Sequence, residues 1–179
     1  MKKILFIGVI LTSVQAYAQV IIGDATGTAT NKTSVLLEFA NSNNKGIILP
    51  YVTTVSASPS EGTLILDASS PTTARVKYYN GAWVDLSGQD GNVSAALASQ
   101  PNLTENSSSK AIIGAQTSSA DGVLVLESAT KAMVLPTVTD VNNIPSPSPG
   151  MLVYVKGTGT SPKKRLAVYN GSKWSFWKP

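Results

Sequence analysis

Short blocks of sequence occur twice in this chain, in the same order. The repeated blocks, first copy against second, are Ile21–Gly23 and Ile112–Gly114, Leu36–Glu38 and Val125–Glu127, Lys45–Thr53 and Lys131–Thr139, Ser58–Leu64 and Ser146–Leu152, and Tyr79–Gly81 and Tyr169–Gly171. A chance similarity would not preserve this order, so the chain is a tandem duplication, and each copy is expected to fold as one structural module.

The segment from Ser87 to Lys110 separates the two copies. It is rich in Ser, Asn, Gly and Gln and poor in large apolar residues, which is typical of a linker. Within it, Val93–Ala98 favours a short helical turn that needs no packed partner. The predicted organisation is a signal peptide over 1–18, a first β module over 19–86, the linker over 87–110 and a second β module over 111–179.

Both copies have the pattern of short strands and turns. Their apolar runs are brief, contain many β-branched residues and are bounded by Gly, Pro, Asn and Ser. Pro50 and Pro136 follow equivalent apolar runs, and because proline cannot donate to a strand ladder, each is expected to end a strand or lie at a sheet edge. The predicted strands, with their counterparts in the second copy, are 34–39, 46–49, 63–67, 75–79 and 82–86. The fold class is therefore mainly β, with two small tandem modules joined by a linker rich in Ser, Asn and Gly.

A Tyr-Asn-Gly segment closes each copy. Asn80–Gly81 predicts a two-residue type I′ hairpin turn, which places Tyr78 opposite Trp83 as a cross-strand aromatic pair. The second copy has one extra residue between its glycine and Trp174. A three-residue loop or a bulge is expected to absorb this residue and bring Trp174 against Tyr169 or Val168.

The N-terminus has the order of a secretory signal peptide. Lys2 and Lys3 precede an apolar run over Ile4–Val14, and small residues flank Tyr17 before Gln19. The apolar run is too short to span a bilayer of about 30 Å, and no later segment approaches about 20 consecutive apolar residues. Export, cleavage before Gln19 and a mature chain without a membrane span are expected.

The composition excludes much of enzyme chemistry. The chain has no histidine and no cysteine, which removes imidazole bases, thiolate nucleophiles, disulfides and most zinc sites. Glu38 and Glu127 are the best candidates for a carboxylate pair, but they occupy equivalent positions in a repeat and are expected to face solvent. We expect no catalytic residue, no cofactor and no metal site.

Two small modules without disulfides also need another source of stability. Each copy is near the size at which the buried core is marginal. Packing of one copy on the other, or association between chains, would supply the missing burial.

The charge is small and uneven. The formal net charge is +4, and removal of Lys2 and Lys3 lowers it to +2 (4 − 2), which does not suggest nucleic-acid binding. Lys163, Lys164 and Arg165 make the C-terminal end basic. They are either solvated positions or a patch with weak attraction to an acidic surface or partner.

Taken together, these blocks resemble a repeat of secreted and surface proteins of the Bacteroidota phylum, which is also found in tail-fibre-like surface proteins. The residues that carry the resemblance are the blocks Lys45–Thr53 and Lys131–Pro136 and the segments Tyr78–Trp83 and Tyr169–Trp174. The resemblance implies an exported, non-enzymatic, β-rich protein whose chains associate, and it assigns no catalytic residues. Ala132 departs from the pattern, because it replaces the glycine that follows the lysine.

The expected function is that of a non-catalytic structural or interaction protein of the cell envelope or cell surface, as a homo-oligomer, a fibre-like element or a partner of another envelope protein. The expected location is the cell surface, the extracellular space or the outer membrane, with the periplasm as the alternative. A second hypothesis is glycan binding or adhesion by aromatic platforms. The candidate interaction residues are Tyr51, Tyr78, Trp83, Lys163, Lys164, Arg165, Trp174 and Trp177.

Overall fold

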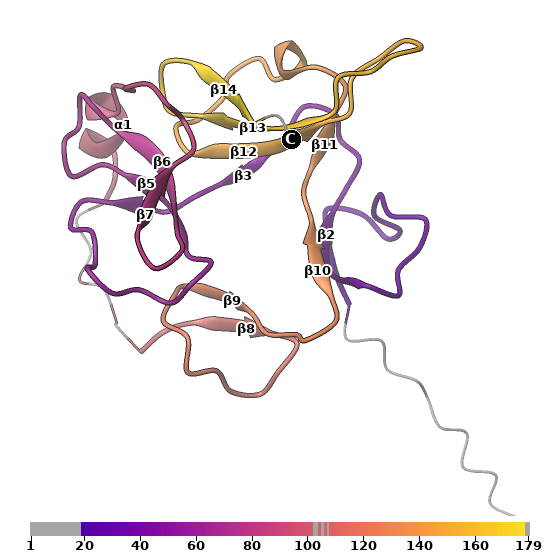
Figure 1. The fold of residues 1–179 in the computed structure, drawn as a ribbon, viewed down its shortest axis with the longest axis horizontal. Helices are drawn as coiled ribbons and strands as arrows, with labels where there is room; N and C mark the ends of the chain where they lie inside the picture. Colours follow the sequence, from indigo (N-terminus) through magenta and orange to yellow (C-terminus); the bar gives the residue numbers. More distant parts are fainter. Residues whose placement is uncertain (1–18, 102–103, 105, 107, 178–179) are drawn as a thin grey trace, which may run out of the picture.

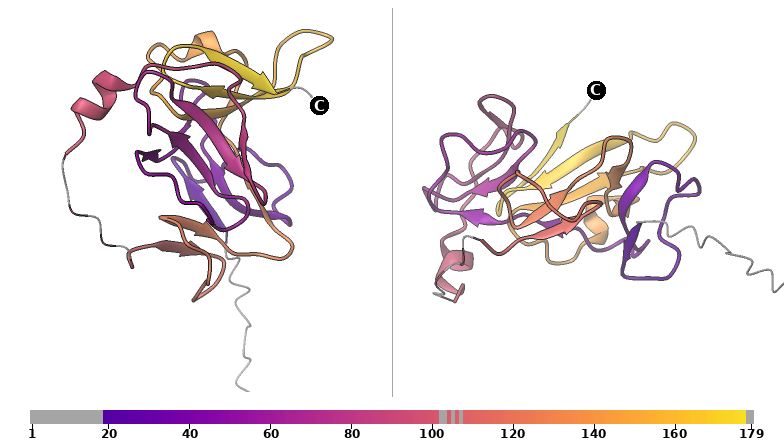
Figure 2. Two further views of the ribbon diagram at one scale, coloured as in Figure 1. Left: turned by 60° about the vertical axis from the view of Figure 1, so that its left-hand side comes forward. Right: turned by 90° about the horizontal axis from the view of Figure 1, so that it is seen from below.

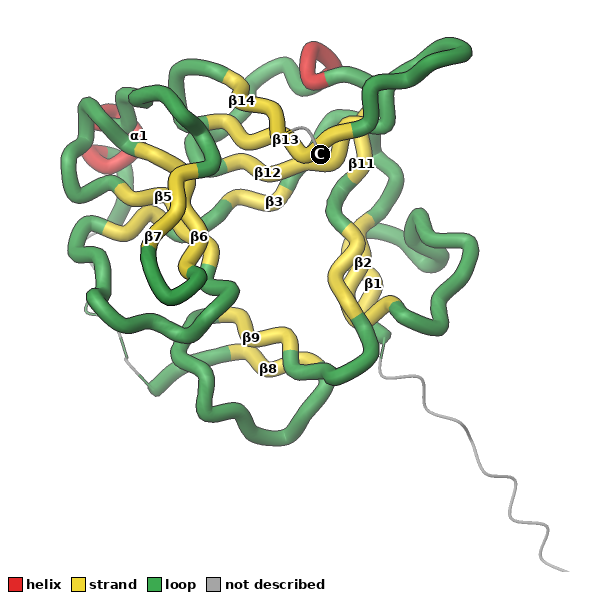
Figure 3. The backbone as a smooth tube through the Cα atoms, viewed as in Figure 1, coloured by secondary structure: helices red, strands yellow, loops and turns green. Residues whose placement is uncertain are grey.

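A computed structural model describes residues 19–101, 104, 106 and 108–177. The expected signal peptide therefore lies outside the described residues. The first copy contains β1 Val20–Ile22, β2 Val35–Phe39, β3 Ile47–Ile48, β4 Tyr51–Val52, β5 Leu64–Asp67, β6 Arg75–Tyr79 and β7 Trp83–Asp85. The second contains β8 Ala111–Ile113, β9 Leu124–Leu126, β10 Ala132–Val134, β11 Thr137–Val138, β12 Met151–Val155, β13 Arg165–Tyr169 and β14 Trp174–Trp177. Two short helical segments, α1 Ser94–Ala98 and the 3-10 turn η1 Val141–Asn143, complete the structure, so the prediction of a mainly β fold is confirmed (Figures 1 and 3).

Each copy repeats the same strand pairing. In the first copy β1 pairs in parallel with β2, and β4, β5, β6 and β7 form a sheet in that order. In the second copy β8 pairs in parallel with β9, and β11, β12, β13 and β14 form the corresponding sheet. Figure 2 shows these two sheets beside each other. The strands of the two copies therefore correspond one to one.

The two prolines interrupt their strands as expected. Pro50 lies between β3 and β4, and Pro136 lies between β10 and β11. Each proline still offers its carbonyl, which accepts a hydrogen bond from Leu66 N–H at 3.0 Å in the first copy and from Tyr154 N–H at 2.9 Å in the second. The prolines thus divide one extended segment into two strands that pair with different partners.

The predicted strand register of the first closing hairpin is wrong by one residue. Trp83 lies opposite Tyr79, not Tyr78, and the two rings pack edge to face with centroids 5.4 Å apart. Gly81 has a positive φ of 71°, but Asn80 does not, so the turn is not of type I′. Asn80 N–H donates to the carbonyl of Ala82 at 3.0 Å, which holds Ala82 in a three-residue loop instead of the strand.

The second closing hairpin keeps the same aromatic pair. Trp174 lies opposite Tyr169, as one of the two predicted registers requires, and the ring centroids are 5.3 Å apart. The loop covers four residues, 170–173, instead of the predicted three, and it absorbs the extra residue without exchanging the faces of β14.

The start of the predicted linker is packed, contrary to expectation. Val93 is 1% exposed within the main apolar cluster, and Ser87 is also buried. Gly91 forms an isolated antiparallel bridge with Ala74, with hydrogen bonds of 2.8 and 2.9 Å. The composition of the segment does not predict this packing, because a single buried valine among polar residues holds the segment against the core. The following helix α1 has no buried residue.

The larger core is shared between the copies. Its buried members from the first copy and the following segment are Leu49, Leu66, Ala68, Ala74, Val76 and Val93, and those from the second copy are Leu152 and Val168. A smaller core under β12 and β13 belongs to the second copy alone. The expectation that one copy supplies burial for the other is therefore confirmed.

Candidate interface between the module copies

The first contact between the copies is made by β3 on β12. The strands are antiparallel, with Ile48 opposite Met151 and Ile47 opposite Leu152. Leu49 N–H continues the pairing by donating to the carbonyl of Gly150 at 3.1 Å. The third strand of the first copy therefore extends the sheet of the second copy.

The second contact uses the third strand of the second copy. β10 pairs in parallel with β2, with Ala132 opposite Val35 and Met133 opposite Leu37, and a register shift lies between these positions. Ala132 N–H donates to the carbonyl of Ser34 at 2.8 Å. Figure 1 shows β10 alongside β2 and β3 alongside β12. Each third strand thus leaves its own copy to pair with the other.

Close packing at this interface explains why residue 46, which precedes β3, is a glycine. A Cβ atom at Gly46 would lie 2.6 Å from Met151 Cγ, 2.7 Å from Val153 Cγ1 and 2.9 Å from the carbonyl oxygen of Leu152. The last of these is a backbone atom, so a side chain at Gly46 would force the two strands apart. The equivalent residue on β10 is Ala132, which is exposed.

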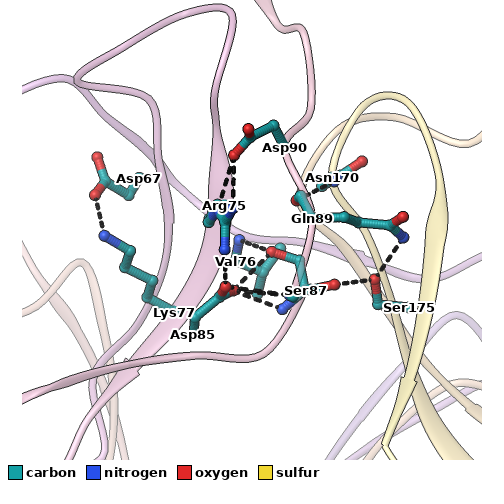
Figure 4. A network of polar contacts seen from close by, with 11 residues as sticks. Asp67, Arg75, Val76, Lys77, Asp85, Ser87, Gln89, Asp90, Asn170 and Ser175 are labelled. Carbon is teal, nitrogen blue, oxygen red and sulfur yellow. Dashed lines mark hydrogen bonds and ion pairs between the residues drawn. The ribbon is translucent and has the colours of Figure 1, made fainter.

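A polar seam joins the segment after β7 to the closing hairpin of the second copy (Figure 4). Gln89 Nε2 donates to Ser175 Oγ at 2.8 Å, and Asn170 Nδ2 donates to the carbonyl of Gln89 at 2.7 Å. Ser175 Oγ in turn donates to the carbonyl of Ser87. Asn170 is fully buried, so these bonds satisfy polar groups that water cannot reach.

Ion pairs fix the neighbouring face of the first copy, also in Figure 4. Arg75 contacts Asp85 at 2.5 Å and Asp90 at 2.8 Å, and Lys77 contacts Asp67 at 2.7 Å. Burial raises the pKa of both Asp67 and Asp85, but hydrogen bonds from Lys77 and Arg75, with others from nearby Ser and Gly residues, outweigh it. The pKa of each carboxyl therefore lies below its ordinary value.

Glu38 is buried, which corrects the expectation that the repeated glutamates face solvent. Its carboxylate pairs with Lys32 and accepts hydrogen bonds from Gln19 Nε2 at 2.7 Å and from the backbone N–H groups of Thr28 at 3.2 Å and Ala29 at 3.0 Å. Burial raises the pKa of Glu38, but the Lys32 contact and the backbone hydrogen bonds more than offset this, so the pKa is lowered. Glu38 anchors the loop between β1 and β2.

Glu127, the equivalent residue of the second copy, is exposed and accepts a hydrogen bond from Ser118. The two glutamates therefore occur in different environments and have different hydrogen-bond partners.

The predicted aromatic residues of the first copy take part in its packing. Tyr51 packs against the shared core, and Trp83 Nε1 donates to the carbonyl of Ser56 at 2.9 Å. Tyr78 lies half-buried on β6 opposite Leu64. These side chains do not form one exposed platform.

The predicted residues of the second copy are more exposed. Trp177 is 60% exposed at the end of β14, whereas Trp174 is half-buried against Tyr169. Lys163 and Lys164 are exposed in the loop before β13, and the Arg165 guanidinium lies 4.1 Å from the ring centre of Phe176. Arg165 therefore belongs to a local cation–π contact.

The residues that form the interface were missed as candidates. Gly46, Ile47, Ile48 and Leu49 lie in one of the blocks that carry the resemblance, and the sequence predicts a strand there without a partner in the other copy. The signal was the combination of a glycine, a short apolar run and a proline, which favours a strand that approaches another backbone closely and then changes partner.

A family model described as a phage tail like trimerisation region matches residues 25–106 and 112–178. The chain belongs to this family. The two matched ranges correspond to the two copies, so the phage tail like trimerisation region occurs twice in the chain. No curated protein and no solved structure matches it.

Membership has direct consequences for function. The family is a structural trimerisation region and not an enzyme family, and it supports association between copies of this chain. Within the described residues, no helix is long and apolar enough to cross a membrane. In the same part of the chain, no group of three or more Asp and Glu side chains is placed to hold a metal ion.

The lowered pKa of Glu38 predicts a loss of stability in acid. A carboxylate whose pKa is lower in the folded state stabilises the fold above its unfolded pKa of about 4.3, and this contribution is lost as pH falls through the folded pKa. Thermal unfolding of Glu38→Gln should show a shallower decrease in Tm below about pH 4. At pH 7 the free energy of unfolding of this variant should be about 2 kcal/mol lower than that of the parent chain, because Lys32 and the backbone donors lose a charged acceptor.

Glu127→Gln is the matched control, since it changes the equivalent but exposed residue. Its free energy of unfolding should stay within about 0.5 kcal/mol of the parent chain. Equal effects of the two substitutions would contradict the role assigned to Glu38.

Proposed function

We propose that this chain is an exported structural subunit. Three such chains assemble, through both module copies of each, into a fibre-like element at the cell surface. The observation that carries the proposal is the presence of two trimerisation regions in one chain, each folded as a β module that exchanges strands with its neighbour. The proposal depends on no catalytic residue.

The interface between the two copies supports association beyond one chain. The first copy contributes β2 and β3 to it, and the second copy contributes β10 and β12. The two copies thus use different surfaces, so the contact is head-to-tail. Each copy therefore keeps one surface that the contact does not use.

The edge of β9 is one unused surface. β9 corresponds to β2, but among the described residues it pairs only with β8 and has no counterpart of β10 beside it. Leu124 is 47% exposed, whereas the equivalent Val35 beneath β10 is 4% exposed. Val123, next to Leu124, is 58% exposed. An exposed apolar strand edge of this kind favours pairing with another chain.

A charge on this edge should break the assembly. Leu124→Asp should convert the purified mature chain from three chains to a smaller species in light scattering, because a carboxylate would be buried at the contact. Ile22→Asp is the control, since Ile22 is 48% exposed on β1 and takes no part in pairing between copies. A parent chain that is monomeric at all concentrations would contradict the proposed function.

Export is tested separately by the mass of the protein recovered from cells. Cleavage of the N-terminal segment should give a chain that begins at Gln19, found outside the cytoplasm. Fractionation and protease accessibility on intact cells then distinguish the outer surface from the periplasm. Retention of an uncleaved chain in the cytoplasm would contradict this part of the proposal.

A further inference from the structure

The first half of β5 is the second unused surface, and its occupant can be inferred if the proposed function holds. β12, the equivalent strand, pairs along its first half with β3 and along its second half with β11. β5 pairs along its second half with β4, through Tyr51 and Val52, but nothing in the described structure pairs with its first half. The position that β3 occupies on β12 is therefore empty on β5.

Two equivalent glycines show the difference. A Cβ atom at Gly150, before β12, would lie 3.3 Å from the carbonyl oxygen of Leu49 and 3.3 Å from Leu66 Cβ. A Cβ atom at Gly62, before β5, would have no neighbour within 4 Å. Both glycines have positive φ angles, 76° at Gly150 and 83° at Gly62, but Gly62 lacks the neighbours that the first copy provides at Gly150.

The backbone of Leu64 is oriented to accept that strand. Tyr79 N–H donates to the carbonyl of Thr63 at 2.9 Å, so Thr63 bonds to the β6 side. Leu64 is opposite Tyr78, at the next position of the antiparallel ladder. Because hydrogen-bonded and non-bonded positions alternate in such a ladder, Leu64 N–H and C=O point away from β6, toward the open edge.

Of the two third strands, only that of the first copy fits without strain. At the observed contact the residue before Ile47 lies so close to the partner backbone that a Cβ would be 2.9 Å from a carbonyl oxygen. Gly46 satisfies this requirement. Ala132, its equivalent, carries a Cβ, so the segment Ala132–Val134 would have to shift outward.

We propose that Gly46–Ile48 of a second chain pairs antiparallel with the first half of β5, with Ile48 opposite Thr63 and Ile47 opposite Leu64. The register is that of β3 on β12, transferred to the equivalent residues. β3 cannot use one edge for two partners, so in the assembly it exchanges β12 of its own chain for β5 of the next. The pairing with β12 is lost and a pairing with β5 is gained, so the number of pairings is unchanged, the first half of β12 becomes open, and one pairing now links chains.

Engineered disulfides test this register directly, because the chain has no cysteine. Residues directly opposite each other have Cβ atoms about 5 Å apart, near enough for a disulfide after small adjustments. Ile48→Cys with Thr63→Cys should oxidise to species that contain two and three linked chains on a non-reducing gel. Ile48→Cys with Leu64→Cys is the control, since a one-residue shift turns the second side chain to the opposite face.

The exchange has its own test. Ile48→Cys with Met151→Cys should form a disulfide within one chain and hold β3 on β12. Light scattering should then show smaller species in the oxidised protein and three chains after reduction. An oxidised protein that keeps three chains would overturn the exchange.

The outcomes separate the two proposals. A parent chain that forms trimers, with no more linkage in Ile48→Cys, Thr63→Cys than in its control, overturns the strand assignment and leaves the trimer intact. A parent chain that stays monomeric overturns the trimer and the strand assignment together.

Discussion

The pairing of each third strand with the other copy is the interaction on which the structure depends. β3 completes the sheet of the second copy, and β10 completes the small sheet of the first. The main apolar core forms where the first copy crosses onto the sheet of the second, around Leu49, Leu66 and Leu152. Without that crossing, each copy would retain only short strands and a core too small for a chain that has no disulfides.

The same constraint connects the fold to its function. A strand that must leave its own module can pair within the chain or between chains, since the contacts are equivalent. The chain belongs to a family described as a trimerisation region, which agrees with the proposed pairing of this strand between chains. The duplication doubles the number of contacts, which strengthens association when both copies engage at once. The buried Asn170 seam and the loop held by Glu38 fix the surfaces around the crossing.

Much of the architecture could be predicted from local pattern. The duplication, the mainly β class, the strand breaks at Pro50 and Pro136 and the aromatic pair at Trp174 all follow from sequence. The register at Trp83 could not, because one hydrogen bond inside the turn decides it. Glu38 and Glu127 have equivalent places in the repeat but different loops around them, so only the folded structure separates the buried carboxylate from the exposed one. The partner of β3 is a long-range pairing that no local pattern specifies.

Amide hydrogen exchange at Leu64 tests the central claim most directly. Leu152, its equivalent, lies opposite Ile47 within the chain, whereas Leu64 faces an open edge in a single chain. In the assembled mature protein, Leu64 N–H should be protected because a strand of the next chain covers it, and Leu152 N–H should exchange faster because β3 has left β12. Fast exchange at Leu64 beside slow exchange at Leu152, in a protein that forms trimers, would contradict the account.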